Sequence, residues 1–244
     1  MDMTRDFIEK LQEMDAPHIV ETELNGLKFC DKKLYRVQKE AKAAALLTET
    51  LTSIVDYIKS GADSNALKDS GRFIVHINDY NSVELLKELN SDKDRDCLVK
   101  AKFETGSFDF GEFVPVEQFI ISLQAAFVQD ENTAKLLQFV SSIKSDSSVQ
   151  QNDDGVGQSV EVRRGISLAQ KVTAPNPVTL HPYRTFPEVE QPESRFVFRI
   201  KHTDSGAFAA LFPADGDRWK HTAITSIADY FKDNLGGTGV IVLA

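Results

Sequence analysis

The spacing of apolar residues in the first 145 residues of the chain predicts a mainly helical part. A helix is expected from about Met3 to Met14, and a second over residues 31–60, where Gly61 is a suitable C-terminal cap. The second helix carries one apolar stripe, formed by Leu47, Leu51, Ile54, Val55 and Ile58. The segment "NDYNSVELLKELNS", residues 78–91, begins with residues typical of helix caps and predicts a further short helix.

The strongest helical pattern starts at Pro115 and continues to about residue 144. Proline suits the first position of a helix, because the N–H that it lacks would have no partner there. Apolar residues then follow helical spacing at Phe119, Ile120, Leu123, Phe127, Leu136, Leu137, Val140 and Ile143. We expect a long helix that forms the spine of the fold, although "QDENT" at 129–133 leaves open a division into two helices.

A few strands interrupt this helical part. Asn25-Gly26 lies between two short alternating runs and predicts a two-residue hairpin turn, because both turn positions favour positive φ. "RFIVHI" at 72–77 and "CLVKAKFE" at 97–104 are predicted strands, and we interpret His76 in the first as a structural histidine. In the turn at 105–113, three phenylalanines are candidates for lining one wall: Phe108, Phe110 and Phe113.

The pattern changes to β after a polar, glycine-containing stretch, for which we predict a flexible loop over 146–158. Residues 159–244 are predicted to be β-rich, with a helix at 223–235 and a buried final strand at 240–244. The expected fold class is α+β: a helical N-terminal half (1–145) and a β-rich C-terminal half with a terminal helix and strand. The two halves are expected to share one core as one composite domain.

Prolines at 177, 182, 187 and 192 mark the most unusual segment of the sequence. Proline fixes φ and removes a hydrogen-bond donor, so residues 175–192 are not expected in the middle of a sheet. We predict an extended, proline-rich arm that is close to polyproline II in places. Such an arm suits two roles, which are wrapping around its own domain and clasping a neighbouring subunit.

The net charge of −9 is distributed unevenly along the chain. Residues 1–157 contain 18 basic and 28 acidic residues, whereas residues 158–244 contain 10 and 9. The interpretations are an acidic body with one locally basic face, or two ordinary solvated surfaces. No apolar run approaches the roughly 20 residues of a membrane helix, and no secretion signal is expected at the N-terminus. Cys30 and Cys97 belong to no CxxC pair and are expected to be reduced thiols in a cytoplasm.

Catalytic and phosphate-binding motifs are absent from the sequence, which contains no GxxxxGK[ST], GxGxxG, HExxH or GxSxG. The turns Asp153-Asp154-Gly155 and Asp215-Gly216-Asp217 offer carboxylates, but neither has the spacing of a calcium loop. We therefore predict no catalytic residue, no metal and no cofactor.

Basic and aromatic residues of the C-terminal half are the candidates for contacts with nucleic acid or with another subunit. In "RFVFRI", alternation places Arg195 and Arg199 on one side of a strand, and this side is expected to face outward. Arg184 is alternatively an internal ion-pair partner, for example of Glu188 or Glu193. The complete candidate set is Arg163, Arg164, Lys171, Tyr183, Arg184, Arg195 and Arg199.

Four blocks of the sequence resemble the YfdQ-like family of uncharacterised phage and prophage proteins. They are "FDFGEFVPVEQFIISLQAAFV" at 108–128, "DDGVGQSVEVRRGI" at 153–166, "NPVTLHPYRTFPEVEQPESRFVFRI" at 176–200 and "ALFPADGDRWK" at 210–220. The resemblance implies a phage origin, an early-gene context beside recombination genes, and the cytoplasm of the bacterial host. It supplies no catalytic residue and no function.

Three functions remain open on the sequence alone. The first is a non-enzymatic, self-assembling protein that forms a homo-oligomeric ring, filament or capsid-like shell, with itself as partner and no membrane. The second is an accessory that binds or anneals single-stranded nucleic acid, with single-stranded DNA or phage recombination proteins as partners. The third is an enzyme or small-molecule sponge that uses the acidic glycine turns.

Overall fold

A computed structural model of the chain describes residues 5–16, 19–21, 28–30, 44–64, 71–90, 93–104, 106–144, 149–153, 158–164, 167–173 and 176–244. For residues 19–21, 28–30 and 143–173 the description covers the backbone only. The contacts within the chain divide it into two units, Met1–Lys42 and Ala43–Ala244. Each unit is described separately below.

The first unit contains a helix and a β-hairpin. Helix α1 spans Arg5–Asp15, and none of its side chains is buried. Strands β1 (Ile19–Glu21) and β2 (Lys28–Cys30) pair antiparallel, as the hairpin signal predicted. The turn at Asn25-Gly26 lies outside the described residues. A two-residue turn at Asn25-Gly26 would place Cys30 opposite Glu21. In the observed register Lys28 lies opposite Glu21 instead.

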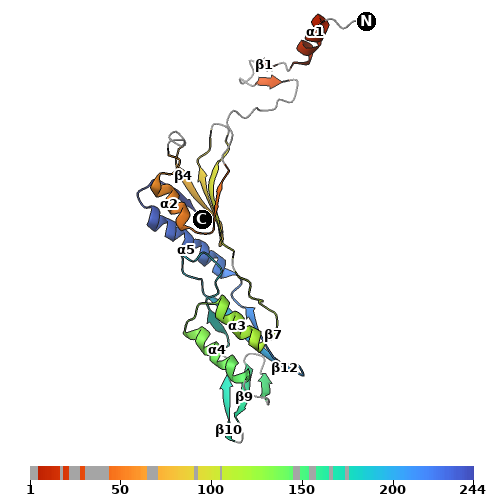
Figure 1. Cartoon of the computed structure of the whole chain (residues 1–244), viewed down its shortest axis with the longest axis vertical. Helices are drawn as coiled ribbons and strands as arrows, with labels where there is room; N and C mark the ends of the chain where they lie inside the picture. The colour runs from red at the N-terminus through yellow and green to blue at the C-terminus, as the bar shows by residue number, and fades with distance from the viewer. Residues whose placement is uncertain are drawn as a thin grey trace. The chain divides into compact units, whose positions relative to one another are not determined.

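A five-stranded mixed sheet forms one half of the second unit (Figure 1). Its order is β14-β4-β5-β6-β3, in which β14 and β3 lie parallel to their neighbours and the other pairs are antiparallel. The strands are β3 (Leu46–Thr48), β4 (Phe73–Asp79), β5 (Ser82–Lys87), β6 (Cys97–Lys102) and β14 (Ile241–Leu243). Helix α2 (Thr52–Ser60) contacts β6, and α5 (Arg218–Leu235) contacts β4.

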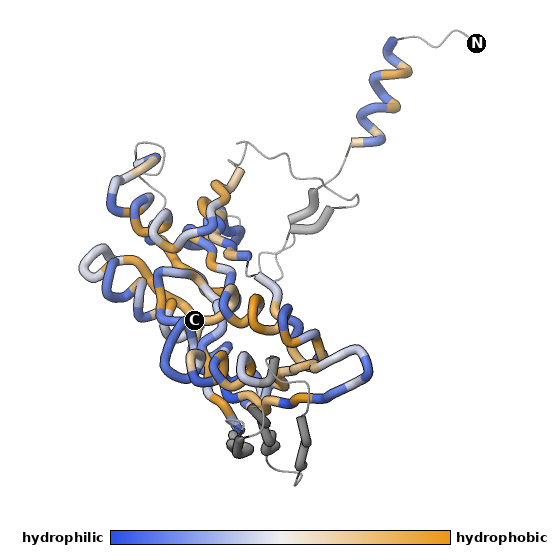
Figure 2. The backbone as a smooth tube through the Cα atoms, turned by 60° about the horizontal axis from the view of Figure 1, so that its bottom comes forward, coloured by the Kyte–Doolittle hydropathy of each residue, from blue (hydrophilic) through white to orange (hydrophobic). Residues whose placement is uncertain are grey.

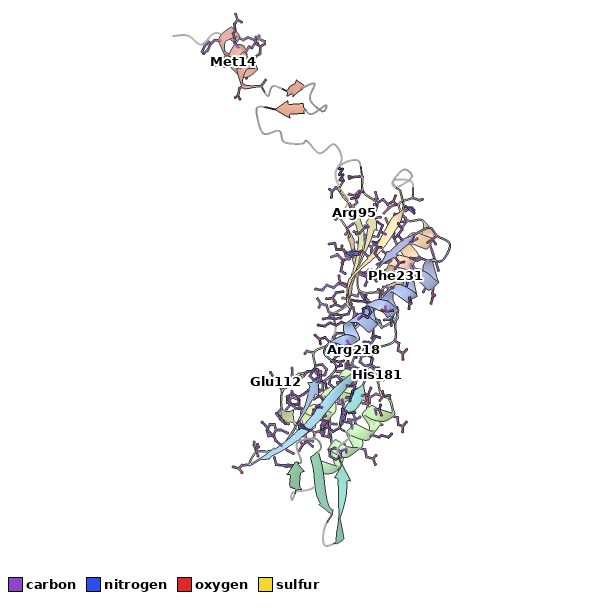
Figure 3. All side chains as sticks on the ribbon, turned by 180° about the vertical axis from the view of Figure 1, so that it is seen from behind. Met14, Arg95, Glu112, His181, Arg218 and Phe231 are labelled. Atoms are coloured by element: carbon purple, nitrogen blue, oxygen red, sulfur yellow. The ribbon has the colours of Figure 1, made fainter. Side chains whose placement is uncertain are left out.

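The core of this half lies between the sheet and the two helices. Phe231 of α5, labelled in Figure 3, is fully buried in it together with Leu85 of β5. Gly61 ends α2 with φ of 66°, a left-handed conformation that favours glycine, and its N–H bonds the carbonyl of Ile58. The predicted cap is therefore confirmed. The helix predicted over 31–60 is wrong at residues 44–51, because Leu46–Thr48 form β3 and α2 begins at Thr52; residues 31–43 lie outside the described part. The apolar stripe is therefore shorter than predicted, and Leu47 is 82% exposed.

A four-stranded antiparallel sheet with two helices forms the other half of the second unit. The sheet order is β11-β12-β13-β7, with β7 (Val114–Pro115), β11 (Val178–Leu180), β12 (Ser194–Thr203) and β13 (Gly206–Pro213). Helices α3 (Val116–Ala126) and α4 (Glu131–Lys144) pack on each other and cover one face of the sheet. The second core lies between the two helices and the sheet, and Phe119, Phe196 and Phe198 are fully buried in it.

A third sheet follows α4. Strands β8 (Val149–Asp153), β9 (Gln158–Arg164) and β10 (Ser167–Thr173) pair antiparallel in the order β10-β9-β8. β8 falls inside the segment 146–158 for which a flexible loop was predicted, so part of that segment is a strand.

The proline-rich segment runs along its own unit and joins the two cores. Leu180 of β11 is buried in the core of the four-stranded sheet, and Phe186 is buried in the core of the five-stranded sheet. β11 is an edge strand, which agrees with the prediction that this segment lies outside the middle of a sheet. Of the two predicted roles of the arm, the structure shows wrapping around its own unit.

Two further helical predictions are wrong. Residues 82–87 form strand β5 because its apolar positions alternate, with Val83 and Leu85 buried, and because it pairs with a strand on each side. The long spine helix is absent from its predicted place, where α3 and α4 are separated at residues 127–130, so the alternative of a division into two helices is confirmed. Phe127 leaves the helix in an extended conformation, is fully buried, and pairs with Pro182. The N-terminal half is therefore mixed α and β, which keeps the α+β class.

Phe186 should be the most important side chain of the proline-rich segment for stability. Replacing it by alanine leaves a cavity in the core, so Phe186→Ala should lower the free energy of unfolding by about 3–5 kcal/mol. Tyr183→Ala is a matched control in the same segment, because Tyr183 is exposed and its loss should change stability by no more than about 0.5 kcal/mol. Denaturant titration measures both values, and equal effects would contradict the packing described here.

Candidate functional site

The structure describes only the backbone at three of the predicted contact residues. Arg163 and Arg164 lie in β9, and Lys171 lies in β10 opposite Glu161. The side chains of these three basic residues lie outside the described part of the structure. Their role as contacts for nucleic acid or another subunit therefore stays a prediction.

The orientation of Arg195 and Arg199 is confirmed. Along β12, Phe196, Phe198 and Ile200 are buried, whereas Arg195 is exposed and Arg199 is half-buried on the opposite side. The alternation therefore gives the three apolar side chains to the core and both arginines to the other face of the sheet. Tyr183 is also exposed, in the proline-rich segment.

Arg184 does not lie on an exposed basic surface with the other arginines. Its guanidinium carbon lies 4.5 Å from the ring centre of Trp219, 4.6 Å from that of Phe110 and 5.4 Å from that of Phe196. Its Nη1 also donates to Ser194 Oγ at 3.0 Å, and Ser194 is buried. Arg184 therefore fills an aromatic cage inside its own unit, and the predicted membership of the basic face is wrong for this residue.

Two aspartates stabilise the charge of Arg184 in this cage. Burial lowers the pKa of the guanidinium, and the charges of Asp215 and Asp217 act in the opposite direction. One carboxylate oxygen of Asp215 is buried without a hydrogen-bond partner among the described residues, so the nearby guanidinium offsets part of its desolvation. The predicted internal ionic role of Arg184 agrees with this environment, but its acidic neighbours are Asp215 and Asp217 instead of Glu188 or Glu193.

The Asp215-Gly216-Asp217 turn is occupied by structural contacts. The N–H of Asp217 donates to Asp215 Oδ1 at 3.2 Å, and Asp217 Oδ2 pairs with Lys220 Nζ at 2.9 Å. The hydrogen bond from Lys220 lowers the pKa of Asp217. No group of three metal-ligating side chains occurs in the part of the chain that the structure describes. Asp153 ends β8, and Asp154-Gly155 lie outside the described residues.

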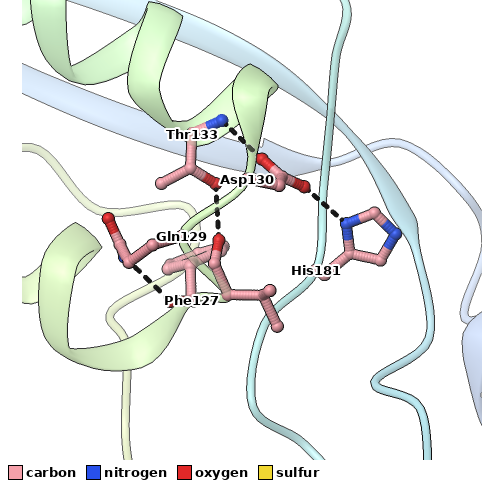
Figure 4. A network of polar contacts seen from close by, with 6 residues as sticks. Phe127, Gln129, Asp130, Thr133 and His181 are labelled. Carbon is pink, nitrogen blue, oxygen red and sulfur yellow. Dashed lines mark hydrogen bonds and ion pairs between the residues drawn. The ribbon is translucent and has the colours of Figure 1, made fainter.

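A second polar cluster, which the sequence did not indicate, lies where α4 begins (Figure 4). His181 Nδ1 lies 2.8 Å from Asp130 Oδ2, and the other oxygen of Asp130 accepts the N–H of Thr133 at 2.7 Å. The hydroxyl of Thr133 donates to the carbonyl of Val128 at 2.9 Å. Burial acts to raise the pKa of Asp130, but the bonds from Thr133 and His181 outweigh it, so the pKa is lowered.

A histidine oriented by a carboxylate can serve as a general base, which requires a nucleophile within reach of the other ring nitrogen. Among the described residues, the polar partner of the His181 ring is Asp130, through Nδ1. Asp130 meanwhile caps α4, because it accepts a hydrogen bond from the N–H three residues on. The pair therefore links the proline-rich segment to α4. The sequence contained a signal for this helix cap: Asp130 is followed by Thr133 three residues later, both within "QDENT", where a division of the helix was considered.

The face of the four-stranded sheet that points away from α3 and α4 carries aromatic and basic side chains. Val197 lies opposite Phe212, Arg199 opposite Ala210, and Lys201 opposite Phe208, so these residues share one face of the sheet. Phe113 packs on the ring of Phe212 with 5.9 Å between centroids. We call this surface the outer sheet face; its members are Phe113, Arg195, Val197, Arg199, Lys201, Phe208 and Phe212. Phe208 and Phe212 are four residues apart in "GAFAALF", so a strand places both side chains on the same face, and this spacing is visible in the sequence.

Comparisons of the chain with models of protein families, with curated proteins and with solved structures find no match. The resemblance to the YfdQ-like family therefore stays a prediction from the quoted sequence blocks. In the described part of the chain, no helix is long and apolar enough to cross a membrane.

The cap that Asp130 forms should have a measurable dependence on pH. Asp130→Ala removes it and should lower the free energy of unfolding by about 1–2 kcal/mol near neutral pH. Because the folded-state pKa of Asp130 is lowered, the stabilisation is present above the unfolded pKa of about 4 and is lost as the pH falls through the folded value. Denaturant curves across a pH series should therefore converge for parent and variant in acid. Asp229→Asn, at an exposed position, is the control.

The cage of Arg184 should require a planar guanidinium. Arg184→Lys keeps the charge but loses the stacking on Trp219 and Phe110, so it should destabilise the protein by about 1–2 kcal/mol. Arg195→Lys makes the same chemical change at an exposed position and should be close to neutral. Thermal or denaturant unfolding compares the two variants, and a neutral Arg184→Lys would show that the cage contributes no stability.

Proposed function

We propose that this chain is a non-enzymatic, self-assembling phage or prophage protein that forms a homo-oligomeric ring, filament or capsid-like shell. The observation that carries the proposal is the apolar side of α1. Four large apolar side chains lie there with 43–73% of their surface exposed: Phe7, Ile8, Leu11 and Met14. In Figure 2, hydrophobic and hydrophilic segments alternate along this helix. The phage origin in this proposal rests on the resemblance of the sequence blocks.

An amphipathic helix with no buried side chain gains free energy when a partner covers its apolar stripe. Burying one side chain of the size of leucine or phenylalanine contributes about 1.5–3 kcal/mol. The four side chains are spaced 1, 3 and 3 residues apart, so they lie along one side of the helix. Contiguous apolar stripes of this kind mark sites of association. A second copy of the chain is always available as a partner, which favours a homo-oligomer.

The five-stranded sheet offers further surfaces of the same kind. β3 and β14 lie at its two edges, and each has an exposed leucine, Leu47 and Leu243. An edge strand presents unpaired backbone groups that can extend the sheet into a neighbour. These edges support an assembling protein but do not define the contact.

Binding of single-stranded nucleic acid is the weaker alternative. Arg184 is withdrawn into its cage, which removes one of the predicted phosphate contacts. The net charge of −9 also opposes binding to a polyanion. The exposed cations of β12, Arg195 and Lys201, still allow a test of this alternative below.

Light scattering of the purified full chain tests the proposal. The parent protein should have a mass that is a multiple of 27.2 kDa at micromolar concentration. Leu11→Asp places a charge in the apolar stripe and should reduce the mass to that of one chain. Gln12→Asp adds the same charge to the polar side of α1 and should leave the oligomer intact.

Two outcomes would count against this function. A parent protein that is monomeric throughout the concentration range would exclude self-assembly. Equal masses for the Leu11→Asp and Gln12→Asp variants would show that the apolar side of α1 is not the contact. Both variants should keep the circular dichroism spectrum of a folded second unit, because no side chain of α1 is buried.

A further inference from the structure

The outer sheet face is an apolar and basic surface that neither core uses. The residues of β12 and β13 with the opposite orientation, such as Phe198 and Leu211, are buried under α3 and α4. Phe113, Val197, Phe208 and Phe212 are outside both core clusters and only partly buried. Three phenylalanines and a valine on one side of a sheet form a surface that association would cover.

Cations accompany these aromatic rings. Lys201 Nζ lies 4.4 Å from the ring centre of Phe113 and 5.8 Å from that of Phe208. Arg199 donates from Nη1 to the carbonyl of Phe198 at 3.3 Å. Among the described residues, Arg195, Arg199 and Lys201 have no carboxylate within ion-pair distance, whereas Lys100, Lys135, Lys220 and Lys232 each do. The outer sheet face therefore combines apolar area with three cations that have no anionic partner in this part of the chain.

Helix α1 has the complementary properties. Its apolar stripe is exposed, and residues 5–15 carry four acidic side chains against two basic ones. The acidic residues are Asp6, Glu9, Glu13 and Asp15. A surface that fits this helix must offer apolar side chains along one line and positive charge beside them. Among the surfaces described here, the outer sheet face meets both conditions.

We propose that α1 of one copy docks on the outer sheet face of the next copy, with its apolar stripe on the phenylalanines and its carboxylates near Arg195, Arg199 and Lys201. The inference rests on the proposed self-assembly and names its contact. Two different surfaces meet in this contact, so it is a head-to-tail interface. Such an interface closes into a ring or continues as a filament, depending on the rotation between successive copies.

A mixing experiment with two defective variants tests the contact. Leu11→Asp damages the helix and leaves the face intact, whereas the double variant Arg199→Glu, Lys201→Glu reverses the charge of the face and leaves the helix intact. Each variant alone should have the mass of one chain, 27.2 kDa. The equimolar mixture should form a 1:1 pair of twice that mass, because only one sound helix and one sound face remain.

The control for the charge reversal is Lys59→Glu, Arg218→Glu. Both residues are exposed on helices that pack on the five-stranded sheet, and the change in charge is identical. This control should assemble as the parent does. Denaturant unfolding should show that the face variant is folded, because its side chains lie outside both cores. The milder Arg199→Gln, Lys201→Gln pair replaces it if the glutamates unfold the protein, and it should weaken assembly in the same direction.

The outcomes separate this contact from the proposed function. If the parent is an oligomer and the mixture of variants stays monomeric, the head-to-tail contact is wrong; docking of α1 within its own chain would give this result. If the face variant stays fully assembled, copies associate through other surfaces, and self-assembly stands without this contact. Fluorescence anisotropy with a labelled single-stranded oligonucleotide at low salt completes the test. Binding that the face variant loses while its mass is unchanged would assign the face to nucleic acid and overturn the proposal.

Discussion

The proline-rich segment connects the core of the four-stranded sheet to the core of the five-stranded sheet. The amide of Gln191 holds the backbone of this segment by hydrogen bonds. Its Oε1 accepts the N–H groups of Arg184 and Thr185, and its Nε2 lies within hydrogen-bond distance of three carbonyls of the same segment. Buried backbone groups that lose water must find partners, and an irregular segment cannot supply them by itself. One buried side chain therefore makes it possible for Phe186 to enter the core of the five-stranded sheet.

Other contacts of the same segment fasten it to the elements on either side. Thr185 Oγ1 donates to the carbonyl of Tyr80 at 2.5 Å, and Glu188 Oε1 accepts the N–H of Thr52 in the first turn of α2 at 3.2 Å. A carboxylate at that position also interacts favourably with the dipole of the helix. His181 reaches Asp130 at the start of α4 in the same way. The proline-rich segment thus connects three parts of its own unit: the turn between β4 and β5, the start of α2 and the start of α4.

The sequence was informative where local pattern and tertiary environment agree. The alternation in β12, the cap at Gly61 and the start of a helix directly after Pro115 could all be predicted, because each depends on a few neighbouring residues. "ELLKEL" has helix-forming residues, yet its first part is a strand because β4 and β6 pair with it. The environment of Arg184 could not be predicted at all. Its cage is built from Phe110, Phe196 and Trp219, which are far from it or from one another along the chain, and no local pattern reports such a meeting.

The first and last described strands of the second unit lie at opposite edges of one sheet. Residues 44 and 45 lead directly into β3, which pairs with β6 at three positions, and the last described strand, β14, lies at the other edge. In an assembly joined through α1, mechanical load on the N-terminal unit reaches β3 before any other element of the second unit. The bond of 2.8 Å between Thr48 Oγ1 and Ser53 Oγ then passes part of this load to α2. The opposing pull would act on the outer sheet face, where α1 of the neighbouring copy docks on β12 and β13, so each copy would carry the load between its five-stranded and four-stranded sheets.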